Sequence, residues 1–425
     1  MREVQNSLIP WLPVIPANWH EVRLKDIGTA RNGLTYKPDD LVEEHQGTIV
    51  LRSSNIQNSK LSFNDNVFVK SFPEELRVLK NDIIICSRNG SVSLVGKCAL
   101  IEHDINATFG AFMMRFRTTQ HPKFSFYLLQ STISAYKSRF GTTTVNQLTN
   151  SVFGNMLTAL PPKEEQEAIA AYLDKECEKI GREIELLERK ADAYKRLRRS
   201  LINRAVTRGL NPDVHLKPSG NDWIGDIPQH WRIERNKNLL IERKDIVGED
   251  KSFKLLSLTL NGIIIRDMEA GGKFPAEFNS YKKVHPNNLV FCLFDMDETP
   301  RTIGLSSYTG MITGAYDVFV VVPEVVSPKW VYYFYFDIDQ RKALKPYYTG
   351  LRKVVKTQKF ANIHIPIPPN KEQQEIVAYL DEKCAKIDAI IEKIGTKIER
   401  LKELKRSLIN EVVTGKRAII INKPC

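Results

Sequence analysis

Residues 163–177 read KEEQEAIAAYLDKEC, and residues 370–384 read NKEQQEIVAYLDEKC. These stretches belong to a longer repeat, because residues 160–207 and 367–414 align without a gap and are identical at 24 of 48 positions. A repeat of this size determines the overall organisation of the chain, whatever the secondary structure of its parts. It predicts a chain of two tandem units, each ending in the same long charged segment.

Each charged segment is predicted to be one long helix. It follows a Pro-Pro pair, where a helix can begin, and contains no further proline up to about residue 207 or 414. Apolar residues recur on a heptad over five heptads in both copies, which predicts a coiled coil. At about 1.5 Å per residue the helix is about 67 Å long, the length of a spacer. The central core positions are Cys177, Ile180, Ile184 and Leu187 in the first copy and Cys384, Ile387, Ile391 and Ile394 in the second.

Charge predicts how the two helices pair. Residues 163–185 carry four basic and eight acidic side chains, whereas residues 186–208 carry eight basic and two acidic. The second copy has the same polarity, with three basic and six acidic in 370–392, then six and three in 393–415. Parallel pairing would set acid beside acid, so antiparallel pairing is expected. Cys177 and Cys384 would then lie near opposite ends of the rod as small core residues, and a readily formed disulfide between them would contradict the model.

The segments upstream of the helices are predicted to be globular. Each is opened by a matched stretch, WLPVIPANW at 11–19 and WIGDIPQHW at 223–231, but the sequences that follow differ. Short strands (GTIVLRSS, NDIIICSR, GAFMMRFR; FKLLSLTL, NLVFCLF, YDVFVVV) alternate with helical stretches (KFSFYLLQSTISAYKSRF; PKWVYYFYFDIDQRKALK). The class is α+β with mixed sheets, in an order that the sequence does not give. Because the two units match at their ends and differ in between, they suggest one scaffold that presents two different surfaces.

Composition excludes several classes of protein. A chain of 425 residues with 42% hydrophobic residues can hold two or three domains with separate cores. It has no apolar run near the roughly 18 residues of a membrane span and does not start like a signal peptide, so a cytoplasmic location is expected. Six scattered cysteines without a Cys-x-x-Cys pair do not fit a disulfide scaffold or a zinc site. The net charge of +12 permits a nucleic-acid partner without requiring one.

No catalytic constellation is found in the sequence. It lacks a Walker loop and a Gly-x-Gly-x-x-Gly after a strand, and NPD at 211–213 falls short of the Asn-Pro-Pro-Tyr pattern of amino-methyltransferases. DMDE at 295–298 is able to ligate a metal, but without a second acidic cluster a solvated loop is the better interpretation. No catalytic residue and no metal site are therefore predicted.

Several turns are rich in side chains that read base edges in DNA. Arginine pairs with guanine, asparagine and glutamine pair with adenine, and threonine methyls contact thymine methyls. Such turns are RNG at 31 and 88, RSSN at 52–55, GTTTVNQ at 141–147 and YYTGLRKVVKTQK at 347–359. The candidate DNA-contacting residues are Arg31, Asn32, Arg52, Ser53, Asn55, Arg88, Asn89, Thr143, Asn146, Arg301, Tyr348, Arg352 and Lys353.

The layout resembles the specificity subunit of type I restriction-modification systems. The residues that carry the resemblance are two copies of Ile-Pro-x-x-Trp and two of Pro-Pro-x-x-x-Glu-Gln. In the first unit they are Ile15, Pro16 and Trp19 with Pro161, Pro162, Glu165 and Gln166. In the second they are Ile227, Pro228 and Trp231 with Pro368, Pro369, Glu372 and Gln373.

The resemblance implies two target recognition domains, each reading one half of a split asymmetric site in double-stranded DNA. They would be separated by two long helices forming an antiparallel, pseudo-twofold coiled coil that serves as ruler and docking surface. The expected segments are 1–160 and 209–367 for the domains, 161–208 and 368–415 for the helices, and 416–425 for a basic tail. Two modification subunits that use S-adenosylmethionine to methylate adenine, and restriction subunits with helicase and nuclease activity that use ATP and Mg, would complete the enzyme. The chain itself would hold no cofactor.

Two alternatives remain open. The chain could be the recognition subunit of a stand-alone methyltransferase, or a DNA-binding scaffold without restriction partners. It could also be a fused enzyme with a diverged site near the DMDE stretch, which predicts metal-dependent activity of the isolated chain.

Overall fold

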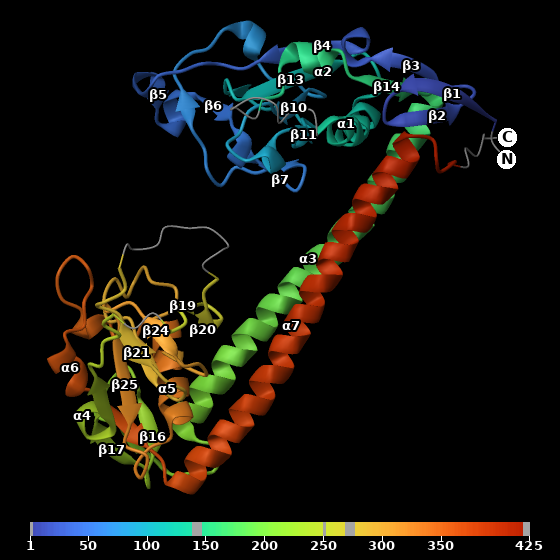
Figure 1. Cartoon of the computed structure of the whole chain (residues 1–425). Helices are drawn as coiled ribbons and strands as arrows, with labels where there is room; N and C mark the ends of the chain where they lie inside the picture. The colour runs from blue at the N-terminus through green and yellow to red at the C-terminus, as the bar shows by residue number, and fades with distance from the viewer. Residues whose placement is uncertain (1–2, 138–146, 250–251, 268–276, 420–425) are drawn as a thin grey trace. The chain divides into compact units, whose positions relative to one another are not determined.

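The computed structural model describes residues 3–137, 147–249, 252–267 and 277–419 (Figure 1). It divides into two compact units. The first unit combines Met1–Leu187 with Lys397–Cys425, and the second unit is the continuous stretch Glu188–Thr396. Each unit therefore holds one globular segment together with one part of both long helices.

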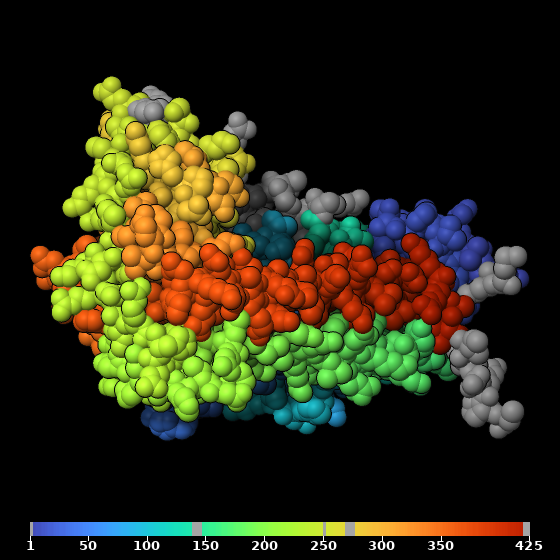
Figure 2. Space-filling view, turned by 90° about the horizontal axis from the view of Figure 1, so that it is seen from below, coloured from blue at the N-terminus to red at the C-terminus, as the bar shows by residue number. Residues whose placement is uncertain are grey.

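The two long helices are α3 (Lys163–Arg208) and α7 (Asn370–Val413), as the repeat predicts. In the first unit, the beginning of α3 shares a core with the end of α7, where Leu173 and Cys177 lie in one cluster with Leu408 and Val412. In the second unit the end of α3 shares a core with the beginning of α7. The antiparallel pairing predicted from charge is confirmed, and Figure 2 shows α3 in green beside α7 in red.

Ion pairs between the helices follow the charge pattern. In the first unit, Glu183 from the acidic half of α3 lies 2.7 Å from Lys397 in the basic half of α7. In the second unit, Arg198 from the basic half of α3 lies 3.1 Å from Asp388 in the acidic half of α7. Because exposed ion pairs contribute about 0–1 kcal/mol each, they select the alignment of the helices more than they stabilise it.

The heptad positions face inward along both helices. Cys177, Cys384, Ile387 and Ile394 are buried. The remaining central core positions are half-buried, because the seam between two helices has solvent on both sides. These positions are Ile180, Ile184, Leu187 and Ile391.

The globular segment of the first unit is built on a four-stranded antiparallel sheet of order β11-β10-β13-β4. A second four-stranded sheet of order β12-β6-β9-β5 contains the parallel pair β12 and β6. The elements of this segment are β1 (Val4–Ile9), β2 (Leu12–Pro16), β3 (His20–Arg23), β4 (Gly28–Asn32), β5 (Leu41–Val42), β6 (Thr48–Leu51), β7 (Ile56–Gln57), β8 (Lys60–Leu61), β9 (Phe68–Val69), β10 (Ile83–Cys86), β11 (Cys98–Leu100), β12 (Ala107–Phe109), β13 (Met113–Thr118), α1 (Pro122–Tyr136), α2 (Asn150–Gly154) and β14 (Leu157–Leu160).

The globular segment of the second unit repeats the antiparallel four-stranded sheet, while its strands β19 with β20 and β21 with β24 form two-stranded sheets. Its four-stranded antiparallel sheet has the order β23-β22-β25-β18, which matches β11-β10-β13-β4 strand for strand. The elements are β15 (Leu216–Pro218), β16 (Asp226–Pro228), β17 (Arg232–Arg235), α4 (Asn236–Leu239), β18 (Leu240–Arg243), β19 (Leu256–Thr259), β20 (Gly262–Ile265), β21 (Lys282–Val284), β22 (Leu289–Phe291), β23 (Ile303–Leu305), β24 (Gly310–Ile312), β25 (Asp317–Val321), α5 (Pro328–Arg341), α6 (Thr357–Ala361) and β26 (His364–Ile367). The α+β prediction is confirmed, and all six predicted strands and both predicted helices are present.

One helix covers the sheet in each segment. Phe124 and Leu128 of α1 pack in the same core as Ile83, Ile85 and Phe116 of the sheet. In the second unit, Trp330 and Phe334 of α5 pack with Leu289 and Phe291. The repeat is thus a repeat of fold as well as of sequence.

The buried helix thiols yield a first prediction. Burial raises the pKa of Cys177 and of Cys384, so both stay protonated below about pH 9, the usual range of a thiol. We expect slow alkylation of both in the native protein at pH 8, fast alkylation after unfolding in urea, and no intrachain Cys177 to Cys384 disulfide under mild oxidation. Peptide mass spectrometry measures all three, and a Cys177 to Cys384 crosslink would contradict the antiparallel pairing.

Candidate nucleic-acid interface

The repeated glutamines join each sheet-covering helix to a long helix. The Gln166 side chain donates to the Pro161 carbonyl at 3.0 Å and accepts from the backbone N–H of His121, just before α1, at 3.1 Å. Gln373 makes the same pair of bonds, to the Pro368 carbonyl at 3.0 Å and from the N–H of Ser327 at 2.8 Å. Both amides are buried, so these bonds hold α1 and α5 in place.

A repeated aspartate adds a second tie. In the first unit, Asp174 accepts from Lys123 at 2.5 Å and from the Tyr127 hydroxyl at 2.9 Å. In the second unit, Asp381 accepts from Lys329 at 2.5 Å and from the Tyr333 hydroxyl at 2.7 Å. Burial raises the pKa of both tyrosines, so each hydroxyl stays a donor at neutral pH.

The Ile-Pro-x-x-Trp motif meets the repeated glutamate of the helix. In the second unit, the indole N–H of Trp231 donates to Glu372 at 3.0 Å, and the His230 ring lies 2.7 Å from the same carboxylate. In the first unit, Glu165 accepts from Asn18 at 3.1 Å. The repeated residues therefore hold the globular segments on the helices, and the surfaces that differ between the units are the candidate recognition surfaces.

The most direct difference lies in the loop after the central strand. β10 ends in Cys86, and the Cys86 thiol donates to the Arg88 carbonyl at 3.6 Å. The equivalent strand β22 is followed by Cys292, which donates to the Phe294 carbonyl at 3.3 Å. Each loop is joined to the chain that follows the sheet-covering helix, by Leu148 N–H to Ser87 O at 2.7 Å and by Val355 N–H to Leu293 O at 2.8 Å. The loops are thus equivalent, but one reads SRNG and the other LFDMDE.

Three predicted residues of the first unit come together at this loop. Asn89 donates to the Ser53 hydroxyl at 3.3 Å, and the Arg88 guanidinium stacks over the exposed Phe112 ring at 5.1 Å. Arg52 lies next to Ser53 but is paired with Asp65 at 2.8 Å. The surface of Ser53, Arg88 and Asn89, with Phe112, is called the first-unit loop surface.

Other predicted residues of the first unit lie elsewhere. Arg31 and Asn32 are exposed on the edge strand β4, where Arg31 lies 3.6 Å from Glu75. Asn55 is fully buried, and its amide donates to the carbonyls of Ser62 and Asp65 at 3.0 and 3.1 Å. These bonds make Asn55 a support of the turn rather than a DNA contact. Thr143 and Asn146 lie outside the described residues.

In the second unit, Arg352 and Lys353 are exposed in the hairpin after α5, in which Thr349 pairs with Val354. Arg352 makes two contacts with Asp295, at 3.2 Å through Nε and 2.5 Å through Nη2, and it stacks over the Phe294 ring at 5.0 Å. The Arg352 guanidinium lowers the pKa of Asp295, so the carboxylate stays charged. The surface of Phe294, Asp295, Arg352 and Lys353 is called the second-unit loop surface.

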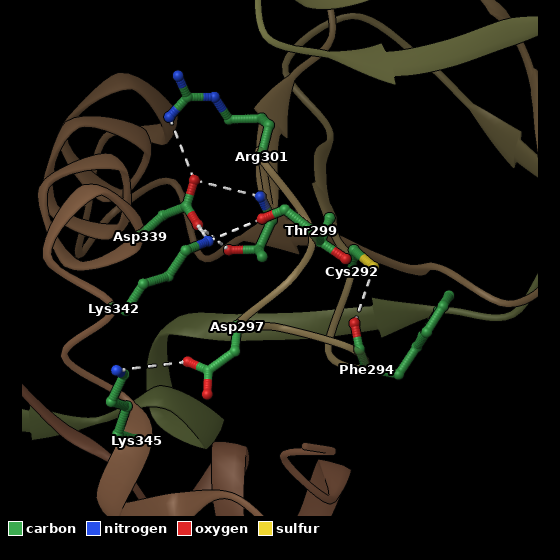
Figure 3. A network of polar contacts seen from close by, with 9 residues as sticks. Cys292, Phe294, Asp297, Thr299, Arg301, Asp339, Lys342 and Lys345 are labelled. Atoms are coloured by element: carbon green, nitrogen blue, oxygen red, sulfur yellow. Dashed lines mark hydrogen bonds and ion pairs between the residues drawn. The ribbon is translucent and has the colours of Figure 1, made fainter. Parts of the chain in front are cut away.

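Two predicted DNA contacts of the second unit turn inward instead. Arg301 pairs with the buried Asp339 at 3.2 Å (Figure 3). It also lies over the Phe336 ring at 4.1 Å, and only 12% of its side chain is exposed. The Tyr348 hydroxyl is buried without a hydrogen-bond partner among the described residues, and burial raises the pKa of Tyr348 to about 12. Neither side chain is placed to reach a base.

The acidic DMDE loop is neutralised by cations of its own unit. Asp295 pairs with Arg352, and Asp297 lies 3.7 Å from Lys345. In the described part of the chain, no three His, Cys, Asp or Glu side chains are grouped as metal ligands would be. Phe294 and Asp295, the partners of Arg352, are not among the residues predicted from the sequence; the local match of NDIIIC (81–86) with NNLVFC (287–292) is the signal that places FDM opposite RNG.

Over the ranges that the structure describes, no helix is long and apolar enough to cross a membrane.

Known proteins resemble the chain over most of its length. The StySPI type I restriction enzyme specificity subunit of Salmonella potsdam is 24% identical over 422 residues, covering 94% of this chain and 89% of that protein. The EcoKI specificity subunit of Escherichia coli K12 is 21% identical over 430 residues, with the same coverage. A solved structure from work on complex assembly and conformational transition of the type I R-M system has a TM-score of 0.65 at 15% identity. It covers 95% of this chain and 99% of that one, and it shows the same fold.

The family model of the type I restriction modification DNA specificity domain matches residues 16–189 and 295–400. The matched ranges include residues 163–189 of α3, residues 370–400 of α7, the loop after β10 and, from Asp295 on, the loop after β22. They make up more than half of the chain. The chain therefore belongs to the type I restriction-modification DNA specificity family, whose members recognise DNA and leave catalysis to other subunits.

Proposed function

We propose that the chain binds double-stranded DNA and that each globular segment reads one half of a bipartite, asymmetric target. The observation that carries this proposal is the pair of four-stranded sheets with the same strand order and different loops. Two equal scaffolds with unequal loops suit two different half-sites. The helices α3 and α7 set the length of the non-specific gap between the two half-sites in the DNA.

The proposed contact surfaces are the two loop surfaces. In the first unit, the guanidinium of Arg88 suits guanine and the amide of Asn89 suits adenine. The hydroxyl of Ser53 can bond to either base. Arg352 and Lys353 supply two cations in the second unit. Arg31 and Asn32 on the edge strand, and Thr143 and Asn146, remain further candidates, whereas Asn55, Arg301 and Tyr348 are left out because of their burial or internal pairing.

The proposed partners carry the chemistry. Two modification subunits would bind S-adenosylmethionine and methylate adenine in the target, and restriction subunits would use ATP and Mg to cleave unmodified DNA. The named relatives are subunits of type I restriction enzymes, which supports a multi-subunit assembly for this chain.

Methylome sequencing of a host that carries this chain together with its modification subunit tests the proposal. We expect methylated adenines in one split motif with two unlike half-sites and a fixed gap. A host with the modification subunit alone is the control and should show no such motif. A single continuous motif, or methylation that does not depend on this chain, would contradict the proposal.

The alternative is a recognition subunit that works without restriction partners. It predicts the same methylation motif but no loss of unmodified plasmid DNA when the restriction subunit is added. Co-purification of tagged chain with the restriction subunit, compared with the modification subunit alone, separates the two.

A further inference from the structure

The guanidinium of Arg352 is held along one edge only. Its Nε and Nη2 atoms contact the two carboxylate oxygens of Asp295, and its Cζ atom lies over the Phe294 ring, 5.0 Å from the ring centroid. Among the described residues, no partner is found for Nη1, and 67% of the side chain is exposed. The end of the fork formed by Nη1 and the outer N–H of Nη2 therefore points away from its internal partners.

That free end is the part of arginine that pairs with guanine. Guanine presents O6 and N7 side by side in the major groove, and an arginine fork fills both acceptors at once. A long side chain normally loses rotamer freedom when it makes such a pair. Here Asp295 and Phe294 have already fixed the guanidinium, so less freedom remains to be lost on binding.

The support beneath Arg352 is itself fixed. Asp295 has a left-handed backbone, with φ of 47°, and its N–H donates to the Arg352 carbonyl at 2.6 Å. Further along the loop, Lys342 donates to the Thr299 carbonyl at 2.8 Å and to Asp339 at 2.8 Å (Figure 3). The Thr302 hydroxyl donates to the buried Asp339 at 2.7 Å. The loop is thus anchored at both ends to elements of its own unit.

The first unit has a similar pair in the equivalent place. Arg88 stacks over Phe112, and Arg88 forms a β-bridge with Gln147, the residue that aligns with Val354 of the Arg352 hairpin. The two arginines come from different loops, and so do their phenylalanines, because Phe112 stands just before β13 whereas Phe294 lies in the loop after β22. Of these two arginines, only Arg352 has a carboxylate partner among the described residues.

On these contacts, and resting on the proposed function, we infer that Arg352 reads one guanine in the half-site of the second unit and that Asp295 is the positioning residue that presents its guanidinium. Lys353 beside it contributes charge toward the phosphates, which carries no sequence information.

The test uses the full-length chain with its modification subunit and a duplex library in which every position of the target is varied in turn. Arg352→Lys keeps the charge but removes the fork, so it should lower the preference for guanine about 5- to 150-fold at one position of one half-site. Asp295→Asn keeps a residue that tolerates the left-handed backbone but loses the charge, so it should lower the preference at the same position by a smaller factor. Lys237→Ala is the matched control: Lys237 is an exposed cation of α4 in the same unit, outside the candidate turns, and its side chain has no partner among the described residues, so the variant should change the preference at no position.

The outcomes separate the inference from the function on which it rests. Unchanged guanine preference in Arg352→Lys, with the wild-type motif intact, overturns the inference alone. An equal loss of preference at all positions of both half-sites also overturns it, because that result reports weaker binding or folding. A wild-type complex without a bipartite motif overturns the proposed function first.

Discussion

A heptad inserted near the middle of both α3 and α7 is expected to widen the gap between the two half-sites by about three base pairs. Seven residues lengthen a helix by about 10 Å, and base pairs are stacked roughly 3.4 Å apart. A whole heptad keeps the apolar seam in phase, so the core of the coiled coil is preserved. Methylome sequencing of the variant reads the gap directly, and both half-sites should keep their sequences.

Inserting the heptad into α3 alone is the matched control. It shifts the register of one helix against the other and separates pairs such as Glu183 with Lys397 or Arg198 with Asp388. That variant should lose methylation rather than move the gap. If the double insertion methylates the wild-type motif with its gap unchanged, the helices do not set the spacing.

Replacing Trp231 by alanine is expected to cost the second unit about 3–5 kcal/mol of unfolding free energy. Trp231 is fully buried, meets Trp330 edge to face at 5.4 Å and donates to Glu372 at 3.0 Å. The change therefore leaves a cavity where the globular segment joins α7, and it removes a donor from a carboxylate. Urea unfolding followed by circular dichroism measures the shift of the midpoint.

Two variants make the result specific. Trp231→Phe keeps most of the ring but loses the bond to Glu372, so it should cost less than alanine. Tyr308→Ala truncates an exposed aromatic residue of the same unit and should stay within about 0.5 kcal/mol of wild type. Equal midpoints for Trp231→Ala and Tyr308→Ala would show that this tryptophan does not hold the segment in place.

The sequence predicted well where residues repeat. The long helices, their antiparallel alignment and the inward-facing heptad follow from local periodicity and from charge, which act along one helix or between two. The strand order of the sheets did not follow, because it is set by side-chain packing between segments far apart in the chain. Equal order in both units is visible only once the pairs are known.

The contacts of the recognition loops could not be predicted either, because they also depend on packing between segments far apart in the chain. An arginine in a turn suggests DNA binding, but the sequence does not show whether that arginine is exposed. Nothing near Arg301 in the sequence indicates that it packs on Phe336 and pairs with Asp339. Asn55 likewise looked like a reader of bases but serves the turn that contains it. Asp295 lies 57 residues before Arg352, too distant for any local pattern to join them.

The division of the long helices between the units has a consequence for how the protein is made. The second unit is one continuous stretch, so it is complete once the chain has grown past Thr396. Most of the first unit precedes the second unit in the chain, yet its core includes Leu408, Ile409, Val412 and Val413, which follow the second unit. During translation the segment of the first unit is therefore made before the second unit but completes its core after it, so its apolar face stays unfilled while the second unit is synthesised.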